Sequence, residues 1–344
     1  MKIKKENDLK ILESIDLFSE QLKQAFFEMN KLRLPADYKK IDEIVVCGMG
    51  GSSLGTDIIK SLYFKNLKKP IYIINGYNLP NWVSKNTLII GSSYSGNTEE
   101  TVSCVKEAFK KKLKLFVITT GGLLEQFAFA NSIPFYVFDP VNNPSAQPRM
   151  GLGYSIMSQL VLFKKIGVLN ITDSLIKKTI NNVSKSANNK KPIASKNAEK
   201  IKGSVPIIVA SEFLSGNAHT LANQINENAK TFSNFFILPE LSHHLLEGLI
   251  KPKNINKNLL FFFLESDSYS NIIKQRIKIT KRVLAQNKIK ALSYKAKQKD
   301  KLAQSLEMII FGSYLSLYLA ITNNVDPLKI PVVDYFKKQL KKKG

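Results

Sequence analysis

The chain has 344 residues, of which 44% are apolar, and it carries a formal net charge of +24. The apolar content, with 20 Phe and 12 Tyr, excludes a disordered chain, and the length suits two domains of ordinary size. The charge comes almost entirely from lysines scattered along the sequence, whereas nucleic-acid-binding proteins more often carry a clustered, arginine-bearing patch, so no specific nucleic-acid binding is expected.

The cysteines, the first residues and the length of the apolar runs indicate the cellular compartment in which the protein works. Cys47 and Cys104 lie in apolar stretches, and no metal-ligand spacing surrounds the 3 histidines, which is typical of a reduced cytoplasm. The first residues, MKIKKENDLKILESI, are charged where a secretory signal peptide is apolar. The run IIFGSYLSLYLAI is shorter than the ~20 residues that cross a bilayer. We expect a cytoplasmic protein that binds no membrane.

The first predicted element is an amphipathic helix over residues 7–30, which we expect to pack on the first domain. From residue 43 onward, short apolar runs alternate with segments of helical periodicity. The runs predict the strands EIVVCG, PIYIING, TLIIGSS, LKLFVIT, IPFYVF, VPIIVAS, NFFILPE, LLFFFLE and KIKALSY. The main helices are expected at 99–112, 150–166, 216–230, 269–285 and 302–322. Strands that are apolar throughout and separated by helices indicate parallel sheets covered on both faces, an α/β fold.

The two halves of the chain resemble each other weakly. EIVVCGMGGSSLGTD, from residue 43, and VPIIVASEFLSGNAHT, from residue 205, both place a strand, a turn of small residues and a helix start at the head of their half. Residues 168–203 are rich in Asn, Lys and Ser and only weakly helical. The prediction is a first domain over 1–167, a helical connection over 168–203 and a second domain over 204–344.

The glycine-rich turn in VVCGMGGSSLGTD, residues 45–57, follows a strand and begins a helix. Such a turn presents backbone N–H groups at the positive end of a helix dipole, which attracts phosphate. A dinucleotide fingerprint is disfavoured because Ser53 stands where its third glycine belongs and no acidic residue ends the next strand. A P-loop is disfavoured because its Gly-Lys pair is absent.

A second turn, GSSYSGNTEET at residues 91–101, also follows a strand and offers the hydroxyls of Ser93, Ser95 and Thr98. Two such turns at the carboxyl ends of neighbouring parallel strands would face one crevice, where open α/β sheets bind ligands. The alternative is that both are ordinary capped helix starts.

Together, CGMGGSSLG and SSYSGNTEET resemble the sugar-isomerase (SIS) domain. Four further motifs resemble, in order and over essentially the whole chain, the bifunctional phosphoglucose/phosphomannose isomerase family: PSAQPRMGLGYS (144–155), QINENAK (224–230), LPELSHH (238–244) and DPLKIPVVDYFKKQL (326–340). The resemblance implies two SIS domains, each a mostly parallel sheet flanked by helices in an αβα sandwich. It implies an enzyme that interconverts glucose 6-phosphate, and also mannose 6-phosphate, with fructose 6-phosphate by proton transfer between C1 and C2 through a cis-enediolate.

The resemblance also implies the site residues. It assigns phosphate binding to Gly51, Ser52, Ser93, Ser95 and Thr98. Glu227 becomes the base, a role that suits a carboxylate able to take a carbon-bound proton and return it to the neighbouring carbon. The alternative is a solvated glutamate on a helix surface.

Three cations complete the predicted site. The resemblance assigns ring opening to His243, assisted by Lys337 or the adjacent Lys338, although His243 is flanked by Ser242 and His244 where the family often has asparagines. Arg149 would contact the substrate and stabilise the enediolate as charge develops. The alternatives are a helix-start histidine and an exposed arginine.

The resemblance implies no cofactor. It implies no metal either, because a zinc-dependent mannose phosphate isomerase needs a cluster of His and Glu ligands in a cupin-like β fold, and the sequence shows neither the cluster nor the strand spacing of that fold. The family resemblance implies a homodimer in which the second copy supplies the histidine. Three other functions stay open: a SIS protein that binds a sugar phosphate without chemistry, an aminosugar enzyme, and a nucleic-acid-binding protein that uses the net charge.

Overall fold

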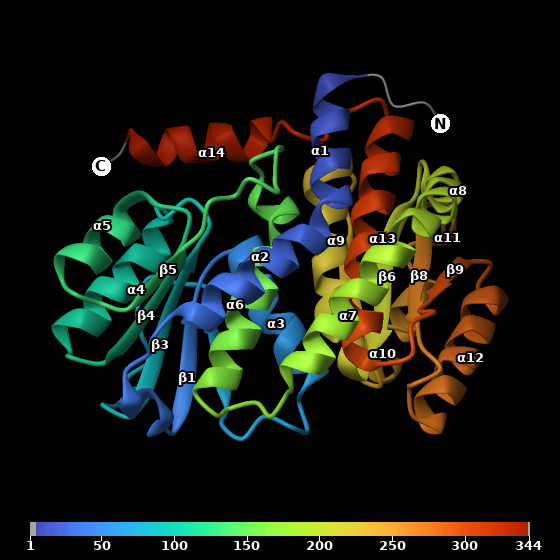
Figure 1. Ribbon diagram of the computed structural model, residues 1–344. Coiled ribbons are helices and arrows are strands. Elements are labelled where there is room, and N and C mark those ends of the chain that lie inside the picture. Colours follow the sequence, from blue (N-terminus) through green and yellow to red (C-terminus); the bar gives the residue numbers. More distant parts are fainter. Residues whose placement is uncertain (1–4, 343–344) are drawn as a thin grey trace.

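Two parallel sheets form the frame of the protein in the computed structural model, which describes residues 5–342 (Figure 1). The first sheet has five strands in the order β2-β1-β3-β4-β5, and the second has four in the order β7-β6-β8-β9. The strands are β1 (Glu43–Cys47), β2 (Ile71–Ile74), β3 (Thr87–Ser93), β4 (Lys114–Thr119), β5 (Phe135–Val137), β6 (Val205–Ser211), β7 (Asn234–Leu238), β8 (Leu259–Glu265) and β9 (Lys290–Lys295). All nine strands expected from the sequence are confirmed within the described residues.

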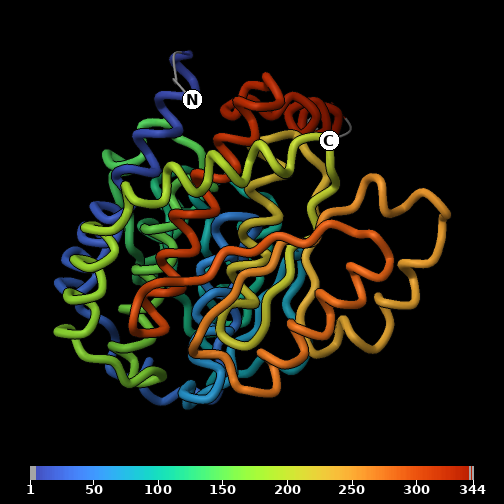
Figure 2. The backbone as a smooth tube through the Cα atoms, turned by 90° about the vertical axis from the view of Figure 1, so that its right-hand side faces the viewer, coloured from blue at the N-terminus to red at the C-terminus, as the bar shows by residue number. Residues whose placement is uncertain are grey.

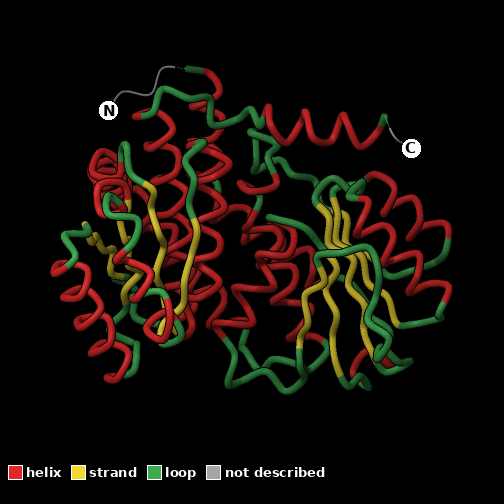
Figure 3. Tube along the Cα trace, turned by 180° about the vertical axis from the view of Figure 1, so that it is seen from behind, coloured by secondary structure: helices red, strands yellow, loops and turns green. Residues whose placement is uncertain are grey.

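Figure 3 shows the two sets of strands on either side of a central group of helices. The α-helices of the first half are α1 (Glu6–Asp16), α2 (Phe18–Lys31), α3 (Gly51–Leu62), α4 (Glu99–Lys110), α5 (Gly122–Ala130) and α6 (Leu152–Lys165). Those of the second half are α7 (Asp173–Ser186), α8 (Lys191–Ile201), α9 (Ser215–Ala229), α10 (Leu241–His244), α11 (Ile255–Asn258), α12 (Asn271–Gln286), α13 (Lys301–Thr322) and α14 (Pro331–Lys341). The predicted main helices are confirmed to within two residues at each end.

Strand β3 shows why the strands are apolar throughout. All of its residues are buried, because helices cover both faces of the sheet. Alternate residues of β1 point to opposite faces: Ile44 and Val46 join one hydrophobic cluster, while Val45 and Cys47 join the other. The strands run parallel as predicted, with Cys47 opposite Gly91 of β3.

The predicted helix over 7–30 is wrong as one continuous element. The chain bends at Leu17, where the backbone leaves helical geometry with φ −85° and ψ 4°. The two pieces have different partners, because α1 packs on α13 of the second half and α2 packs on α6 of the first. Ile15, near the end of α1, and Phe18, at the start of α2, are both buried.

The polar segment between the sheets forms two helices, α7 and α8, which pack along α13. Their buried residues include Ile176, Ile180 and Ala198, so this connection contributes to the core.

By length and composition alone, helix α13 is long and apolar enough to cross a membrane, so the expectation that its apolar run is too short was wrong. The helix has 22 residues, because it begins before the apolar run, in a segment that contains Gln304 and Glu307. The most apolar part of this helix is 89% buried inside the protein, as in the core helix of an α/β protein.

The central helices α3 and α9 lie antiparallel, and this arrangement positions the site. A Cβ atom on Gly216, at the start of α9, would lie 2.7 Å from the Cα of Ile58, near the end of α3. The start of α3 lies instead against the segment at Arg149, which the last turns of α9 contact. One end of the molecule therefore combines the beginning of α3 with the end of α9. Figures 1 and 2 show α1 and α14 at this same end.

Candidate active site

The first predicted phosphate turn lies between β1 and α3. Gly50 has φ +50°, a conformation that favours glycine, and Gly51 begins the helix. The Ser52 hydroxyl oxygen accepts the backbone N–H of Tyr94 at 3.0 Å, a bond that leaves the Ser52 O–H to donate elsewhere. This bond ties the first turn to the second.

The second turn, between β3 and α4, places its hydroxyls close together. The Ser93 and Thr98 hydroxyl oxygens lie 2.8 Å apart, and the Ser95 hydroxyl accepts the backbone N–H of Asn97 at 3.3 Å. Ser93 is buried, whereas Ser95 is exposed. Thr98 occupies the N-cap position of α4, but its side chain makes no capping bond there. Neither α3 nor α4 begins with a side-chain capping bond, so the interpretation of these turns as ordinary capped helix starts is not what the structure has.

A third turn, which the sequence analysis missed, is hydrogen-bonded to the second turn. After β4, Thr120 donates both its N–H and its hydroxyl to the Tyr94 carbonyl, at 3.0 and 2.6 Å. Gly96 has φ +68°, and a Cβ there would lie 1.7 Å from the carbonyl oxygen of Gly121. The dipeptide Gly121–Gly122 directly after a strand was the available signal, because glycines at such a place indicate close backbone approach.

Arg149 connects the phosphate turns to the second half. It lies in the short 3₁₀ segment η2 (Pro148–Met150), and its side chain is only 3% exposed, so the alternative of an exposed arginine is wrong. The guanidinium donates Nε to the Asn228 Oδ1 (2.6 Å), Nη1 to the Gln147 Oε1 (2.8 Å) and the Glu227 Oε2 (3.2 Å), and Nη2 to the carbonyls of Pro327 (2.7 Å) and Leu328 (3.0 Å). Every one of its five N–H donors therefore has an acceptor within the protein.

Burial lowers the pKa of Arg149, and the negative charges of Glu227 and then Asp326 oppose that shift. An arginine with a lowered pKa still remains protonated at neutral pH. The Arg149 charge is thus fixed in place by protein groups and faces the carboxylate of Glu227.

Gly51 and Arg149 bring the phosphate turns next to Glu227. A Cβ on Gly51 would lie 2.9 Å from the Pro148 carbonyl oxygen and 3.3 Å from the Arg149 nitrogen. Only the length of the Arg149 side chain then separates the first phosphate turn from the Glu227 carboxylate. Glu227 itself keeps 35% of its side chain exposed in the last turn of α9, so it is accessible to a ligand.

Lys230 is, after Arg149, a second charged neighbour of Glu227, and the sequence analysis missed it. It ends α9 in the left-handed conformation, and its Nζ donates to the Glu227 carbonyl at 2.7 Å. Burial and then the charge of Arg149 lower the pKa of Lys230, while Asp326 and Glu227 oppose the shift.

His243 is not brought to this site within one chain. It lies on α10, directly after β7, and the carboxyl ends of β6 and β7 are paired through Ser211 and Leu238. Those strand ends lie at the start of α9, whereas Glu227 lies twelve residues further on, about 18 Å along the helix axis. Within one chain His243 therefore lies far from Glu227, and the sequence analysis expected the histidine of this site to come from a second copy.

The predicted lysine lies on α14, which Figure 1 shows as an arm extending over the side of the molecule that holds the first sheet. Lys337 and Lys338 are both exposed. The helix also exposes Val332, Tyr335 and Phe336, at 79%, 66% and 61%. Its base is nevertheless attached to the site, because Arg149 binds the carbonyls that directly precede it.

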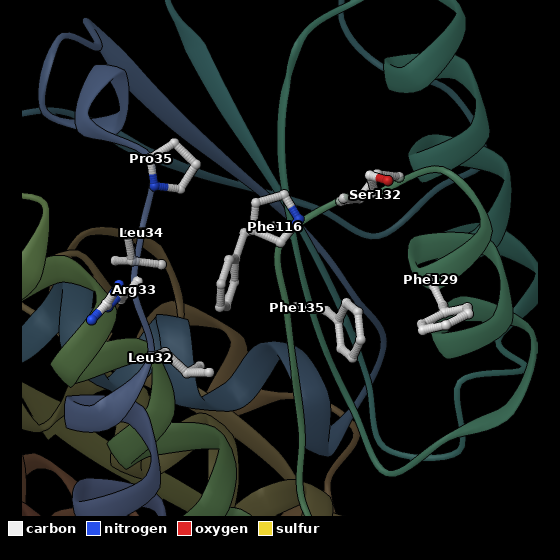
Figure 4. A pocket seen from close by; sticks show the side chains of 10 residues that line it. Leu32, Arg33, Leu34, Pro35, Phe116, Phe129, Ser132 and Phe135 are labelled. Atoms are coloured by element: carbon white, nitrogen blue, oxygen red, sulfur yellow. The ribbon is translucent and has the colours of Figure 1, made fainter.

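Among residues 5–342, no three or more His, Cys, Asp or Glu side chains gather in a group that could hold a metal ion. A surface hollow of about 600 Å³ lies between the start of β5, the end of α5 and the Leu32–Pro35 segment (Figure 4). Its lining includes Phe116, Phe129 and Phe135. Because residues that precede β5 line it, the hollow lies away from the carboxyl strand ends, and it is not the candidate site.

The chain is similar to known sugar-phosphate isomerases over most of its length. A model of the bacterial phosphoglucose isomerase C-terminal SIS domain matches residues 190–340. A bifunctional phosphoglucose/phosphomannose isomerase of Caldicellulosiruptor bescii is 32% identical over 96% of this chain and 98% of its own length. One from Aquifex aeolicus is 31% identical over 87% of this chain and 90% of its own.

Among solved structures, tagatose-6-phosphate ketose/aldose isomerase from Escherichia coli has the same fold, with a TM-score of 0.72 over 93% of this chain and 94% of that one, at 14% identity.

Proposed function

We propose, from the premise that this chain belongs to the bifunctional phosphoglucose/phosphomannose isomerase family, that the two serine turns and Glu227 form the active site of its aldose–ketose isomerase activity. The enzyme interconverts glucose 6-phosphate and mannose 6-phosphate with fructose 6-phosphate. The observation that carries the assignment of the site is the contact of Gly51 with Pro148 and Arg149, whose guanidinium faces Glu227.

The phosphate binds at the turns. The Ser52 and Thr98 hydroxyls and the N–H groups that begin α4 supply donors to the phosphate oxygens, and the Ser93 hydroxyl is hydrogen-bonded to that of Thr98. Ser95 and Gly51 line the same edge. Anchoring a group remote from the reacting carbons fixes their position relative to Glu227 and converts binding free energy into orientation.

Proton transfer takes place at the other end of the sugar. Glu227 removes the proton from C2 of the open-chain aldose, and the electrons of the C–H bond form the enediolate as the C1 carbonyl oxygen gains negative charge. The C2 hydroxyl passes its proton to the C1 oxygen and Glu227 returns the carbon-bound proton to C1, so that C2 becomes the ketone and C1 an alcohol. The Arg149 charge stabilises the enediolate through the field at the site, since its own N–H groups are bonded to protein acceptors. No step requires a cofactor or a metal ion.

Ring opening requires a second copy of the chain. His243 lies at the far end of α9 from Glu227 in its own chain, which supports the proposal that the histidine comes from a partner. The exposed apolar residues of α14 offer a surface for that partner, and Lys337 and Lys338 lie on the same helix. The protein is proposed to work as a homodimer in the cytoplasm, with no nucleic acid or membrane partner.

The direct test is turnover by purified protein of each hexose 6-phosphate, with and without a chelator. Turnover of both aldoses, unchanged by the chelator, is the expected result. Loss of activity on chelation would refute the metal-free mechanism. Binding of a sugar phosphate without turnover would identify the alternative, a SIS protein that only senses its ligand.

The dimer is tested by mixing two inactive variants, Glu227→Gln and His243→Ala. If each site combines Glu227 of one copy with His243 of the other, mixed dimers contain one intact site, and about a quarter of the sites recover. Activity that stays absent after subunit exchange, with hybrid dimers shown to form, would contradict the shared site.

A further inference from the structure

The polar contacts between α9 and α13 have a repeated form. Asn217 donates to the Ser305 carbonyl at 2.9 Å and accepts the hydroxyl of the same serine at 2.9 Å. Further along α9, Gln224 donates to the Ser313 hydroxyl at 2.9 Å, and Asn228 donates to the Ser316 hydroxyl at 2.9 Å. All three amides are buried, so each contact is a fully desolvated bond.

Only the amides near the end of α9 reach Arg149. The Asn228 Oδ1 accepts the Arg149 Nε–H at 2.6 Å, and Gln224 donates toward the Arg149 carbonyl at 3.4 Å. Asn228 is 0% exposed and is held from behind by Ser316, so its amide has a single orientation available. The guanidinium is planar, and fixing Nε therefore fixes the direction of Nη1 toward Glu227.

We propose that Asn228 is a positioning residue of the isomerase: by holding Nε of Arg149, it sets the guanidinium so that Nη1 orients the Glu227 carboxylate toward the substrate carbons. The inference rests on the proposed role of Glu227 as base. Asn228 touches no substrate in this arrangement and acts through Arg149.

The charged groups around the site bear on the pH dependence. Arg149 comes from η2, Lys230 from the end of α9 and Asp326 from the segment between α13 and α14. A carboxylate at position 228 would add a negative charge that shares Arg149 with Glu227. Added negative charge favours the protonated, inactive base, so activity would require a higher pH.

Two variants and a matched control test the proposal. Asn228→Ala is expected to lower kcat about 100-fold and to change KM far less, because the reacting carbons lose alignment while the phosphate anchor stays intact. The isosteric Asn228→Asp is expected to move the acidic limb of the kcat/KM profile up by about one pH unit. Asn217→Ala removes an equivalent buried amide from the same helix and should leave kcat and the pH profile unchanged.

Three outcomes decide between the possibilities. If kcat of Asn228→Ala lies within twofold of that of Asn217→Ala, or if the acidic limb of Asn228→Asp stays where it is in the unmodified protein, Asn228 is structural only and the inference fails. If Asn228→Ala does not fold, the Asn228→Asp profile alone decides. An unmodified protein without isomerase activity would instead refute the proposed function.

Discussion

The two β–turn–helix units of this protein, β1 to α3 and β6 to α9, have the same local pattern but contribute opposite ends to the site. In the first unit the turn and the start of the helix form the proposed phosphate anchor. In the second unit the turn lies at the other end of the molecule, and the last turn of the helix carries Glu227. The antiparallel arrangement of α3 and α9 accounts for this difference.

In the β6–α9 unit, other groups of the protein occupy the turn. Ser211 donates its hydroxyl to the Leu238 carbonyl at 2.7 Å and its N–H to the Tyr269 hydroxyl at 3.2 Å. Gly216 lies directly against the backbone of Ile58. A strand, a small-residue turn and a helix therefore do not by themselves make an anion site, because the outcome depends on what packs onto the turn.

The largest effect is expected at the end of α9. Glu227→Gln removes the base but keeps the shape of the side chain, so we expect isomerisation to fall by about 10³-fold or more while the sugar phosphate still binds. A coupled turnover assay and a calorimetric titration with fructose 6-phosphate measure the two quantities. Near-normal turnover would show that the second unit does not supply the base.

A pair of glycines separates the roles of the two helix starts. Gly51→Ala would push on Pro148 and Arg149, and we expect a loss in kcat of about 100-fold from the misplaced guanidinium. Gly216→Ala would push on Ile58 and is expected to cost about 1–3 kcal/mol of unfolding free energy with little change in the activity of the folded protein.

Gly248→Ala, where a Cβ meets nothing within 4 Å, is the control for both glycine variants. Turnover and urea unfolding of the three variants provide the measurements. The distinction between the units would be lost if Gly51→Ala changed only stability.

Ser52 in the β1–α3 unit and Ser211 in the β6–α9 unit should also differ, the first affecting substrate binding and the second stability. Ser52→Ala removes a donor to the phosphate, and we expect KM to rise about tenfold. Ser211→Ala leaves the buried Leu238 carbonyl without its bond, and it should lower the unfolding free energy by about 1–3 kcal/mol without changing KM. Steady-state kinetics and thermal melts check both. Equal KM values for the two variants would contradict the phosphate site.

The smallest effect is expected on stability at Asp326, in the segment that joins α13 to α14. Burial acts to raise the pKa of Asp326, but hydrogen bonds from the Asn7 side chain and from the backbone of Leu328 and Lys329 outweigh it and leave the pKa lowered. A lowered folded-state pKa contributes stability that is present above about pH 3.9, the ordinary value for Asp, and is lost as the pH falls below it.

Asp326→Asn should therefore lower Tm by a few degrees near pH 7 and converge with the unmodified protein in acid. Melting curves from pH 2 to pH 7 test this expectation. A difference in Tm that did not shrink in acid would show that the Asp326 charge is unimportant.

Much of this arrangement could be predicted from the sequence, since strands, turns and most helix bounds follow from local periodicity and turn chemistry. The bend at Leu17 and the surroundings of Arg149 could not. Arg149 takes its acceptors from its own segment, from α9 and from the residues before α14, and no local pattern reveals that these three segments meet.

By itself the sequence determined two parallel α/β halves, two serine turns after strands and a glutamate in a helix, because each of these depends on neighbours only a few residues away. The tertiary structure decided which ends of these units meet. The sheets point in opposite directions, so Glu227 joins the phosphate turns while His243 lies at the far end of the same helix. That choice comes from the packing of α3 against α9 and of both on α13, which are contacts between segments far apart in the chain.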